Sequence, residues 1–454
     1  MYLYTICMLL IFLIQAILRI VAYPFFLFFY LLRIGPFYRR VSFESKNYLD
    51  EGTRAFSRVG KKAHCLFHFS SEGEFEQIRP IIDELISHGK NVELLFTSPS
   101  VEHKVVEYYQ AHRERVRYLR LPLITYFPLL KRQNIIAWSS ASKMMMVRYD
   151  FFPELIYLGS KMSEFILFSA TSKSSKARFN KDGKPIISWI KKFIYAQFSE
   201  VIAATIEDQK VFESAQLGTQ IVAPIELRML QINSRQKSFR KHKHYEFLSQ
   251  ILGLYLYQDR ICLAQMWINE FTFFNDTNLL NDIADKKKFV FLAPHLLKED
   301  KVEEMLSEIK KLSPKLKIHI LDESKLTLES FQSFLKEITM SPGLILCTVK
   351  GILCEIYPYF HKVYVGGGHG KGVHSLLEPF VAGSRIFCGP NIHRSTEYDM
   401  IISSNFNIKI IEDCHEIYHI MSQENEDSMK PEVISAMIEE SELAKRKLIN
   451  LLTK

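Results

Sequence analysis

The chain has 454 residues, of which 48% are hydrophobic and 24% charged, with a formal net charge of +8. This composition is typical of a globular protein with room for two domains, and it excludes a disordered chain. The positive charge is moderate and spread along the chain, so it favours phosphorylated ligands or an anionic membrane surface. We expect no nucleic-acid partner, because zinc-finger, basic-zipper and RNA-binding aromatic patterns are absent from the sequence.

The seven cysteines are scattered and form no CxxC pair. Most lie in apolar runs, which together with their odd number indicates a reducing compartment. No structural zinc site is implied, and no DxD-like pair stands at the end of a predicted strand. We therefore expect neither a metal nor a cofactor.

The first predicted segment is residues 1–40, in which Tyr2–Ile34 is almost continuously apolar. This run is longer than the roughly 20 residues that one membrane helix needs, and it lacks a signal-peptide cleavage pattern. Arg33 lies at its end, Arg39 and Arg40 follow it, and nothing basic precedes it, so the positive-inside rule places the rest of the chain in the cytoplasm. The sequence predicts a single-pass or interfacial membrane anchor. The alternative is a hydrophobic helix packed on a soluble core.

Residues 41–231 form the first predicted domain, in which short apolar runs alternate with amphipathic helices. AHCLFHF and NVELLFT are expected strands, and each leads through a turn into a helix. Regular alternation implies a parallel sheet with crossover helices. Further strands are expected at Val116–Leu121, Ile135–Ala137, Phe165–Ser169, Phe198–Ala204 and Gln220–Val222.

Residues 232–287 break this rhythm and are predicted to be a linker or insertion. They begin with a basic segment, NSRQKSFRKHKH, which is either a solvated linker or a contact with a membrane surface. The alternation resumes in a second α/β domain at 288–430, and residues 431–454 are predicted to be an amphipathic C-terminal helix. The strands expected in the second domain are Phe289–Ala293, Lys317–Leu321, Gly343–Thr348 and Val363–Val365.

The second domain contains a glycine turn that is typical of a ligand site. Gly366–Pro390 reads as three glycines, a short helix over SLLEPFVAG and a strand, which completes a βαβ unit. Ligands of open α/β sheets bind at the carboxyl ends of such strands, where glycines let the backbone approach closely. Glu378 lies about one helical turn beyond, where it can accept hydrogen bonds from sugar hydroxyls. From the spacing alone, a ligand site and a purely structural turn with a solvated Glu378 are equally well supported.

Several motifs occur in a fixed order: HFSSEGEFEQIRP (His68–Pro80), FTSPS (Phe96–Ser100), RYDFFPEL (Arg148–Leu155), and KGILCEIY with VYVGGGHGKGVHSLLEPFVAG (within Lys350–Gly383). They resemble motifs of the bacterial 3-deoxy-D-manno-oct-2-ulosonic acid (Kdo) transferases of lipid A–core assembly. The resemblance implies a GT-B fold, in which two Rossmann-like α/β domains face a central cleft. It also implies an N-terminal membrane anchor helix that precedes the two domains in the sequence. It also implies transfer of Kdo from CMP-Kdo to lipid IVA or a related lipid A precursor, on the cytoplasmic side of the inner membrane.

The resemblance assigns roles to individual residues. Glu74 matches the catalytic base, although a first-turn carboxylate stabilised by the helix dipole is the plain alternative. Asp150 matches an acidic position that orients the acceptor or supports Glu74. Ser98 and Ser100 either bind the acceptor or only cap a turn. The remaining implied contacts are Ser71 and Arg148 for the acceptor, and Lys350, Gly351, Ile352, Ser375, Leu376, Leu377 and Glu378 for the CMP nucleotide.

Three segments depart from the family, all on the donor side. The family's G-D-T-R-F-D reads APIELR (Ala223–Arg228), its G-S-T-W-P-E-D-E reads PHLLKEDK (Pro294–Lys301), and its Pro-Arg or Pro-His falls on Leu321-Asp322. Loss of the Gly-Ser-Thr loop removes N–H donors for phosphate, and Asp322 would repel a cytidylate. His295 and Lys298 are candidate replacement anion contacts.

Three hypotheses therefore stand. The chain is an active Kdo transferase with rebuilt donor contacts, a related GT-B transferase that uses another nucleotide sugar, or a non-catalytic homologue. The homologue would bind a lipid A precursor or a partner enzyme at the membrane. Retention of Glu74 and Glu378 argues against the last hypothesis, because a binding module needs neither a base nor a ribose contact.

Overall fold

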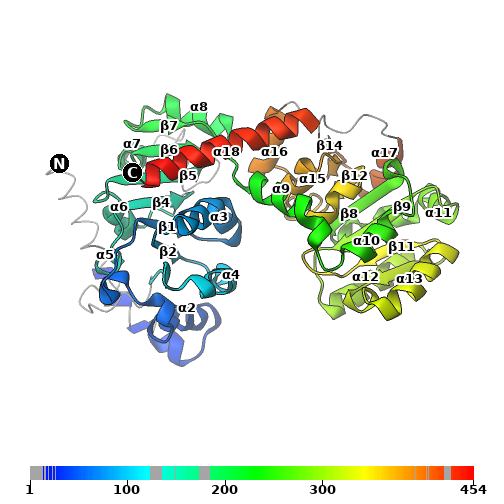
Figure 1. Ribbon diagram of the computed structural model, residues 1–454, viewed down its shortest axis with the longest axis horizontal. Helices are drawn as coiled ribbons and strands as arrows, with labels where there is room; N and C mark the ends of the chain where they lie inside the picture. Colours follow the sequence, from blue (N-terminus) through cyan, green and yellow to red (C-terminus); the bar gives the residue numbers. More distant parts are fainter. Residues whose placement is uncertain are drawn as a thin grey trace. The chain divides into compact units, whose positions relative to one another are not determined.

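The computed structural model describes residues 14–453 apart from residues 15, 16, 19, 23, 26, 123–134, 149, 173–184, 394, 405, 407 and 424–430. The chain folds into two compact units, residues 1–228 with 442–454 and residues 229–441 (Figure 1). Each unit contains a seven-stranded sheet, and all of its pairings are parallel. The prediction of two α/β domains with parallel sheets is confirmed.

The first unit has the strand order β3-β2-β1-β4-β5-β6-β7. Its strands are almost continuously buried, as expected for a parallel sheet covered by helices on both faces. The strands are β1 (Cys65–Phe69), β2 (Val92–Phe96), β3 (Val116–Arg120), β4 (Lys143–Val147), β5 (Glu164–Ala170), β6 (Glu200–Ala203) and β7 (Gln220–Val222). The helices are α2 (Gly35–Ser45), α3 (Glu72–Ser87), α4 (Pro99–Tyr109), α5 (Ile135–Trp138), α6 (Pro153–Gly159), α7 (Pro185–Tyr195) and α8 (Ile206–Ser214).

The second unit has the order β10-β11-β9-β8-β12-β13-β14. Alternate residues of β9 enter different clusters, Phe289 and Phe291 in one and Val290 and Leu292 in the other, so each face of this sheet has its own core. The strands are β8 (Arg260–Met266), β9 (Phe289–Pro294), β10 (Ile318–Leu321), β11 (Leu344–Cys347), β12 (Lys362–Val365), β13 (Arg385–Cys388) and β14 (Lys409–Ile410).

Helices flank the second sheet on both faces (Figure 1). They are α9 (Arg228–Ser238), α10 (Tyr245–Leu252), α11 (Thr277–Ala284), α12 (Glu299–Leu312), α13 (Leu328–Met340), α14 (Leu353–Ile356), α15 (Leu377–Val381), α16 (Thr396–Ser403) and α17 (Ile417–Gln423). The βαβ unit predicted after the glycine turn is present as β12, α15 and β13, and its two strands pair in parallel.

Two expectations need correction. The segment 232–287 is not a linker, because its residues Arg260–Met266 form β8, which lies between β9 and β12 near the middle of the second sheet. Ile135–Ala137, expected as a strand, lies in the short helix α5. Three apolar residues fit either period, so local pattern could not decide between them.

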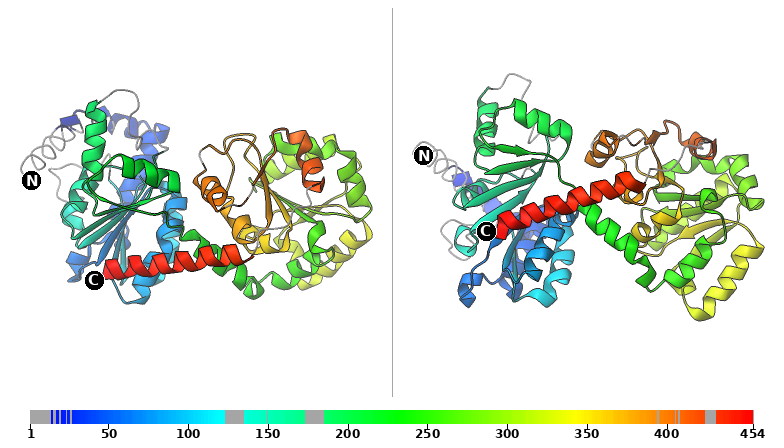
Figure 2. Two further views of the ribbon diagram at one scale, coloured as in Figure 1. Left: turned by 90° about the horizontal axis from the view of Figure 1, so that it is seen from above. Right: turned by 45° about the horizontal axis from the view of Figure 1, so that its top comes forward.

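The predicted terminal helix is α18 (Pro431–Thr453), drawn in red in Figure 2. Its residues through Ser441 belong to the second unit, and those from Glu442 belong to the first. Within the first unit, Lys143 Nζ donates to the Leu451 carbonyl at 2.5 Å and Lys445 Nζ lies 3.6 Å from Glu84 Oε2. These contacts fasten the end of the chain to the first unit.

Much of the predicted anchor lies outside the described residues. Among those described, no single helix is long and apolar enough to cross a membrane. A pair of helices, Ile20–Leu31 and Gly35–Tyr48, meets the length and composition criteria together but is bent by 100° between them.

Candidate functional site

Each sheet has one place where the chain's connections change direction. In the first sheet it lies between β1 and β4, and in the second between β8 and β12. Ligands of open α/β sheets bind outside the carboxyl ends of the strands at such a switch point. Glu74 follows β1, and Arg148 and Asp150 follow β4. The predicted catalytic pair, Glu74 and Asp150, and the predicted acceptor contact Arg148 therefore lie at the first switch point.

Glu74 lies in the first turn of α3 and is 8% exposed. Ser71 caps this helix by accepting the Glu74 N–H at 3.3 Å, and Glu74 Oε2 accepts the Ser70 N–H at 2.6 Å. The other carboxylate oxygen, Oε1, lies 3.9 Å from Arg148 Nε. A β-carbon placed on the adjacent Gly73 would meet no described atom within 4 Å. One oxygen is therefore fixed by the backbone, and there is open space beside the turn.

Two buried polar atoms beside this carboxylate have no hydrogen-bond partner among the described residues, Ser70 Oγ and Arg148 Nε. Arg148 also has a left-handed backbone, with φ of 66°, which costs energy for a residue with a side chain. Unsatisfied polar atoms and backbone strain at the carboxyl edge of a sheet are typical of a site that a ligand completes.

Burial raises the pKa of Glu74, and the negative charge of Asp150 raises it further. The Ser70 N–H and the positive charge of Arg148 oppose this shift without cancelling it. A carboxylate with a raised pKa is a better proton acceptor near neutral pH than an ordinary glutamate.

Ser98 accepts the Ser100 N–H at 3.2 Å and so caps α4, as the turn-capping alternative proposes. The two hydroxyl oxygens are 2.8 Å apart, in exposed positions. Capping therefore does not remove these hydroxyls from solvent.

Arg40 has a structural role that its sequence position did not reveal. It donates to the carbonyl oxygens of Thr97 and Leu121, which directly follow β2 and β3, and to Glu44 Oε1 at 2.7 Å. The last residue of the predicted anchor segment thereby ties the chain to the carboxyl edge of the first sheet.

In the second unit, the glycine turn is held by packing and by a buried carboxylate. A β-carbon on Gly366 would lie 2.5 Å from the Gln265 carbonyl oxygen, so only glycine fits there. Glu270 accepts N–H bonds from Gly367 at 2.9 Å and from Trp267 at 3.1 Å. Glu270 is fully buried, and burial raises its pKa. It comes from the segment that was predicted to be a linker.

The start of α15, which the resemblance assigns to the nucleotide, already has an anionic partner. Glu397 Oε2 accepts hydrogen bonds from Ser375 Oγ at 3.1 Å, Leu376 N at 2.7 Å and Leu377 N at 3.0 Å. The side chains of Leu376 and Leu377 are fully buried in the core. These backbone donors are therefore satisfied within the protein.

Helix α9 connects the other donor-side segments. Arg235 donates to both carboxylate oxygens of Glu355, at 2.7 and 2.9 Å, and to the Gly351 carbonyl at 3.0 Å. Gln236 Nε2 donates to the Glu378 carbonyl at 2.9 Å. Lys350 is exposed and Ile352 is buried on either side of Gly351, which has φ of 70°. Arg235 lies in the basic run that was interpreted as a linker or membrane contact.

Of the altered donor positions, Asp322 caps a short helical turn by accepting the N–H groups of Ser324 and Lys325. His295 stacks between two other rings at the second switch point, and the exposed Lys298 precedes α12. Within the described residues, no group of three or more His, Cys, Asp or Glu side chains could hold a metal ion.

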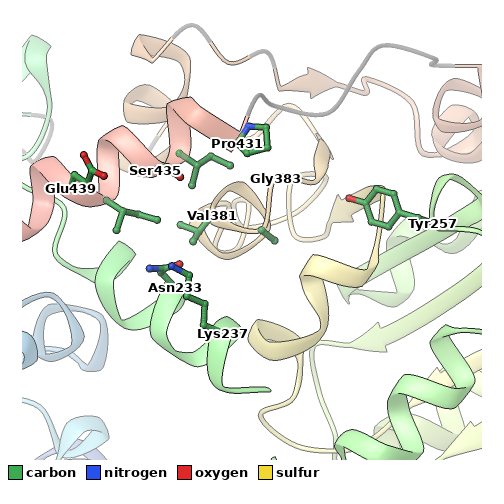
Figure 3. Close-up of a pocket in the computed structure, with 11 residues that line it drawn as sticks. Asn233, Lys237, Tyr257, Val381, Gly383, Pro431, Ser435 and Glu439 are labelled. Atoms are coloured by element: carbon green, nitrogen blue, oxygen red, sulfur yellow. The ribbon is translucent and has the colours of Figure 1, made fainter. Parts of the chain in front are cut away.

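A pocket of about 440 Å³ lies elsewhere in the second unit, near the start of β13 (Figure 3). It is lined by α9, by the residues that end α15 and by the first turns of α18, including Lys237, Gly383 and Glu439. None of the predicted site residues lines it.

Residues 47–229 match the family model described as 3-deoxy-D-manno-octulosonic-acid transferase (kdotransferase). No curated protein matches the chain. Among solved structures, the C-terminal CMP-Kdo binding domain of WaaA from Acinetobacter baumannii is 20% identical with a TM-score of 0.33, over 48% of this chain and 97% of that one. UDP-GlcNAc 2-epimerase from Methanocaldococcus jannaschii is 11% identical with a TM-score of 0.49, over 81% and 95% of the two chains.

Proposed function

We propose that the chain is a glycosyltransferase that transfers Kdo from CMP-Kdo to lipid IVA with Glu74 as the base, because residues 47–229 match the family model of the Kdo transferases. The observation that carries this proposal is the buried carboxylate of Glu74 at the first switch point. It has a raised pKa, open space beside it and unsatisfied polar neighbours.

In the proposed reaction, a hydroxyl oxygen of the lipid acceptor attacks the anomeric carbon of Kdo. A new glycosidic bond forms, the bond from that carbon to the phosphate oxygen breaks, and CMP leaves with the bonding electron pair. Glu74 Oε1, the oxygen that faces Arg148, takes the hydroxyl proton. Asp150 assists by keeping the pKa of Glu74 high.

The acceptor is a phosphorylated lipid, and the first unit offers suitable groups for it. The buried Nε–H of Arg148 has no hydrogen-bond partner among the described residues, so it can donate to an oxygen of the acceptor. A phosphate oxygen suits this role, because guanidinium groups bind phosphate well. Ser98 and Ser100 provide exposed hydroxyls, and Ser71 holds the turn that carries Glu74. We assign acceptor binding to this edge.

Donor binding belongs, in this proposal, to the second unit. Glu378 contacts the ribose, and the segment Lys350–Ile352 lies against the nucleotide, held in place by Arg235. Because Glu397 already accepts the N–H groups at the start of α15, the anionic part of the donor needs further partners.

We also propose that the N-terminal apolar segment attaches the enzyme to the cytoplasmic face of the inner membrane, where the lipid acceptor resides. Large apolar side chains such as Leu18, Phe25 and Leu31 are more than half exposed in this segment. Burial of such side chains in lipid removes apolar surface from water. Arg40 joins this segment to the acceptor edge.

The direct test is to incubate detergent-solubilised protein with CMP-Kdo and lipid IVA and to look for the glycosylated lipid by mass spectrometry. We expect product with the wild type and none with Glu74→Ala. Transfer from a different nucleotide sugar but not from CMP-Kdo would favour the second hypothesis, which the altered PHLLKEDK segment motivates. Lipid binding without transfer from any donor would favour a non-catalytic homologue.

A further inference from the structure

Three aromatic rings stack at the second switch point. Trp267 directly follows β8, His295 directly follows β9, and His374 lies in the turn after β12. The centroid of the His295 ring is 4.5 Å from that of Trp267 and 4.1 Å from that of His374, with interplanar angles of 22° and 13°. Three neighbouring strands thus each contribute one ring at their carboxyl ends.

One hydrogen bond determines which nitrogen of His374 carries its proton. Trp267 Nε1 donates to His374 Nε2 at 2.8 Å. An indole N–H can only donate, so His374 Nε2 must be the acceptor, and the ring proton must lie on Nδ1. His374 therefore presents an N–H donor at Nδ1.

The remaining ring nitrogens are available. Among the described residues, His374 Nδ1 and both nitrogens of His295 make no hydrogen bond, and none of the three is a buried atom. Burial lowers the pKa of both imidazoles, that of His374 to about 4, so both are neutral at physiological pH. They face a ligand as hydrogen-bond donors and acceptors rather than as fixed cations.

The position of the stack in the sequence connects it with the lost donor loop. His295 is the second residue of PHLLKEDK, the segment that stands where the resembling family has a Gly-Ser-Thr loop. Trp267 also precedes Glu270, which holds the glycine turn. The rings and the turn are therefore one connected structure.

We propose that Trp267, His295 and His374 form a binding site for an oxyanion of the sugar donor, either its carboxylate or its phosphate. The N–H groups of the two imidazoles replace the N–H donors of a Gly-Ser-Thr loop, and the indole holds His374 in the required tautomer. The ligand class is a nucleotide-activated sugar acid. This inference rests on the proposed function, because it takes the donor from there.

Fluorescence of Trp267 provides a readout that does not depend on catalysis. Wild type, His295→Gln, His374→Gln and the control His419→Gln, which changes an exposed residue of α17, are titrated with CMP-Kdo, CMP, free Kdo and orthophosphate. A Trp267→Phe variant identifies the signal. The His295 side chain makes no hydrogen bond within the described residues, and its backbone bond to the Met266 carbonyl remains in the variant, so the replacement removes no hydrogen bond from the fold.

We expect both stack variants to bind CMP-Kdo about tenfold more weakly or worse, as for a lost hydrogen bond to a charged group, while the control binds as the wild type does. Quenching by free Kdo would identify the carboxylate as the bound group, and quenching by CMP and orthophosphate would identify the phosphate. Unchanged CMP-Kdo affinity in His295→Gln and His374→Gln would overturn the stack proposal alone. A wild type that binds neither CMP-Kdo nor CMP would overturn this proposal together with the proposed donor.

Discussion

Each of the two sheets has a switch point at its carboxyl edge, and the two switch points have different contents. In the first unit the switch point holds a carboxylate with one oxygen near Arg148, an open glycine and unsatisfied polar atoms. In the second unit, two carboxylates accept backbone N–H bonds at the corresponding edge, Glu270 at the glycine turn and Glu397 at the start of α15.

This difference matches a difference in what each edge must do. In the proposed function Glu74 is a base, which has to remain reactive, and burial and incomplete hydrogen bonding favour this. The proposed nucleotide site has to be rigid before binding, which the buried Glu270 and the half-buried Glu397 favour by accepting backbone N–H bonds. We infer that the acceptor edge contains the chemistry and the donor edge contains the preorganisation, and the following predictions test that division.

The largest effect is expected from Glu74→Gln. The amide keeps an oxygen for the Ser70 N–H, so the helix start remains, but it cannot take a proton. Transfer from CMP-Kdo to lipid IVA should slow by about 10²–10⁴-fold, the usual range for a lost general base. Glu72→Gln is the matched control, because Glu72 lies in the same first turn and pairs with Lys104. Equal transfer rates for the two variants would exclude Glu74 as the general base.

Glu270→Ala should destabilise the second unit. The change leaves the N–H groups of Trp267 and Gly367 and the Tyr364 hydroxyl without their buried acceptor. We expect a loss of about 3 kcal/mol in the free energy of unfolding, measured by denaturant titration. Glu303→Ala, on the exposed side of α12, should change it by less than about 0.5 kcal/mol. A Glu270→Ala protein as stable as the wild type would show that the glycine turn keeps its conformation without the Glu270 carboxylate.

Arg235→Met should weaken donor binding without changing the chemistry of the first unit. It removes the bonds to Glu355 and to the Gly351 carbonyl, so Lys350–Ile352 loses its support. We expect the KM for CMP-Kdo to rise about tenfold, with kcat affected much less. Lys241→Met, an exposed change just beyond α9, is the control. A fall in kcat at unchanged KM would contradict the assignment.

The pH dependence of transfer should report Glu74. The base acts only when unprotonated, so the rate falls as the pH drops through its pKa, which burial raises above the usual glutamate range. Arg148→Met removes a positive charge that lowers this pKa, so its acid limb should move to higher pH. The measurement is the transfer rate of the wild type and of Arg148→Met as a function of pH. A shift of the acid limb to lower pH in the variant would contradict the ion pair between Arg148 and Glu74.

Ser98→Ala should have the smallest effect. Loss of the α4 cap should cost about 1 kcal/mol of stability, read from the unfolding midpoint. If the hydroxyl also binds the acceptor, the KM for lipid IVA rises as well. An unchanged KM would restrict Ser98 to capping.

Much of this fold follows from local pattern. The strands β1, β2 and β9, and the βαβ unit at the glycine turn, were predicted because each apolar run stands next to a clear turn and an amphipathic helix. The strand β8 was missed because its run, RICLAQM, lies in a stretch that begins with a basic segment and was interpreted as a linker or insertion. Its place near the centre of the sheet is a property of long-range pairing.

The candidate site divides in the same way. Glu74 and Glu378 could be proposed as site residues from the sequence because they lie inside short motifs. Glu397 and Arg235 could not, since their partners are about 20 and 120 residues away in the sequence and no local spacing connects them. Residues that support a site through such contacts carry little signal in a single sequence.

The most direct test of the division of labour measures two quantities on the same preparations, the affinity for CMP-Kdo and the rate of transfer to lipid IVA. We predict that Glu74→Gln binds CMP-Kdo as the wild type does and transfers almost nothing, whereas Arg235→Met binds it weakly and transfers well once saturated. Loss of donor affinity in Glu74→Gln, or normal affinity in Arg235→Met, would contradict the assignment of base and donor site to separate units.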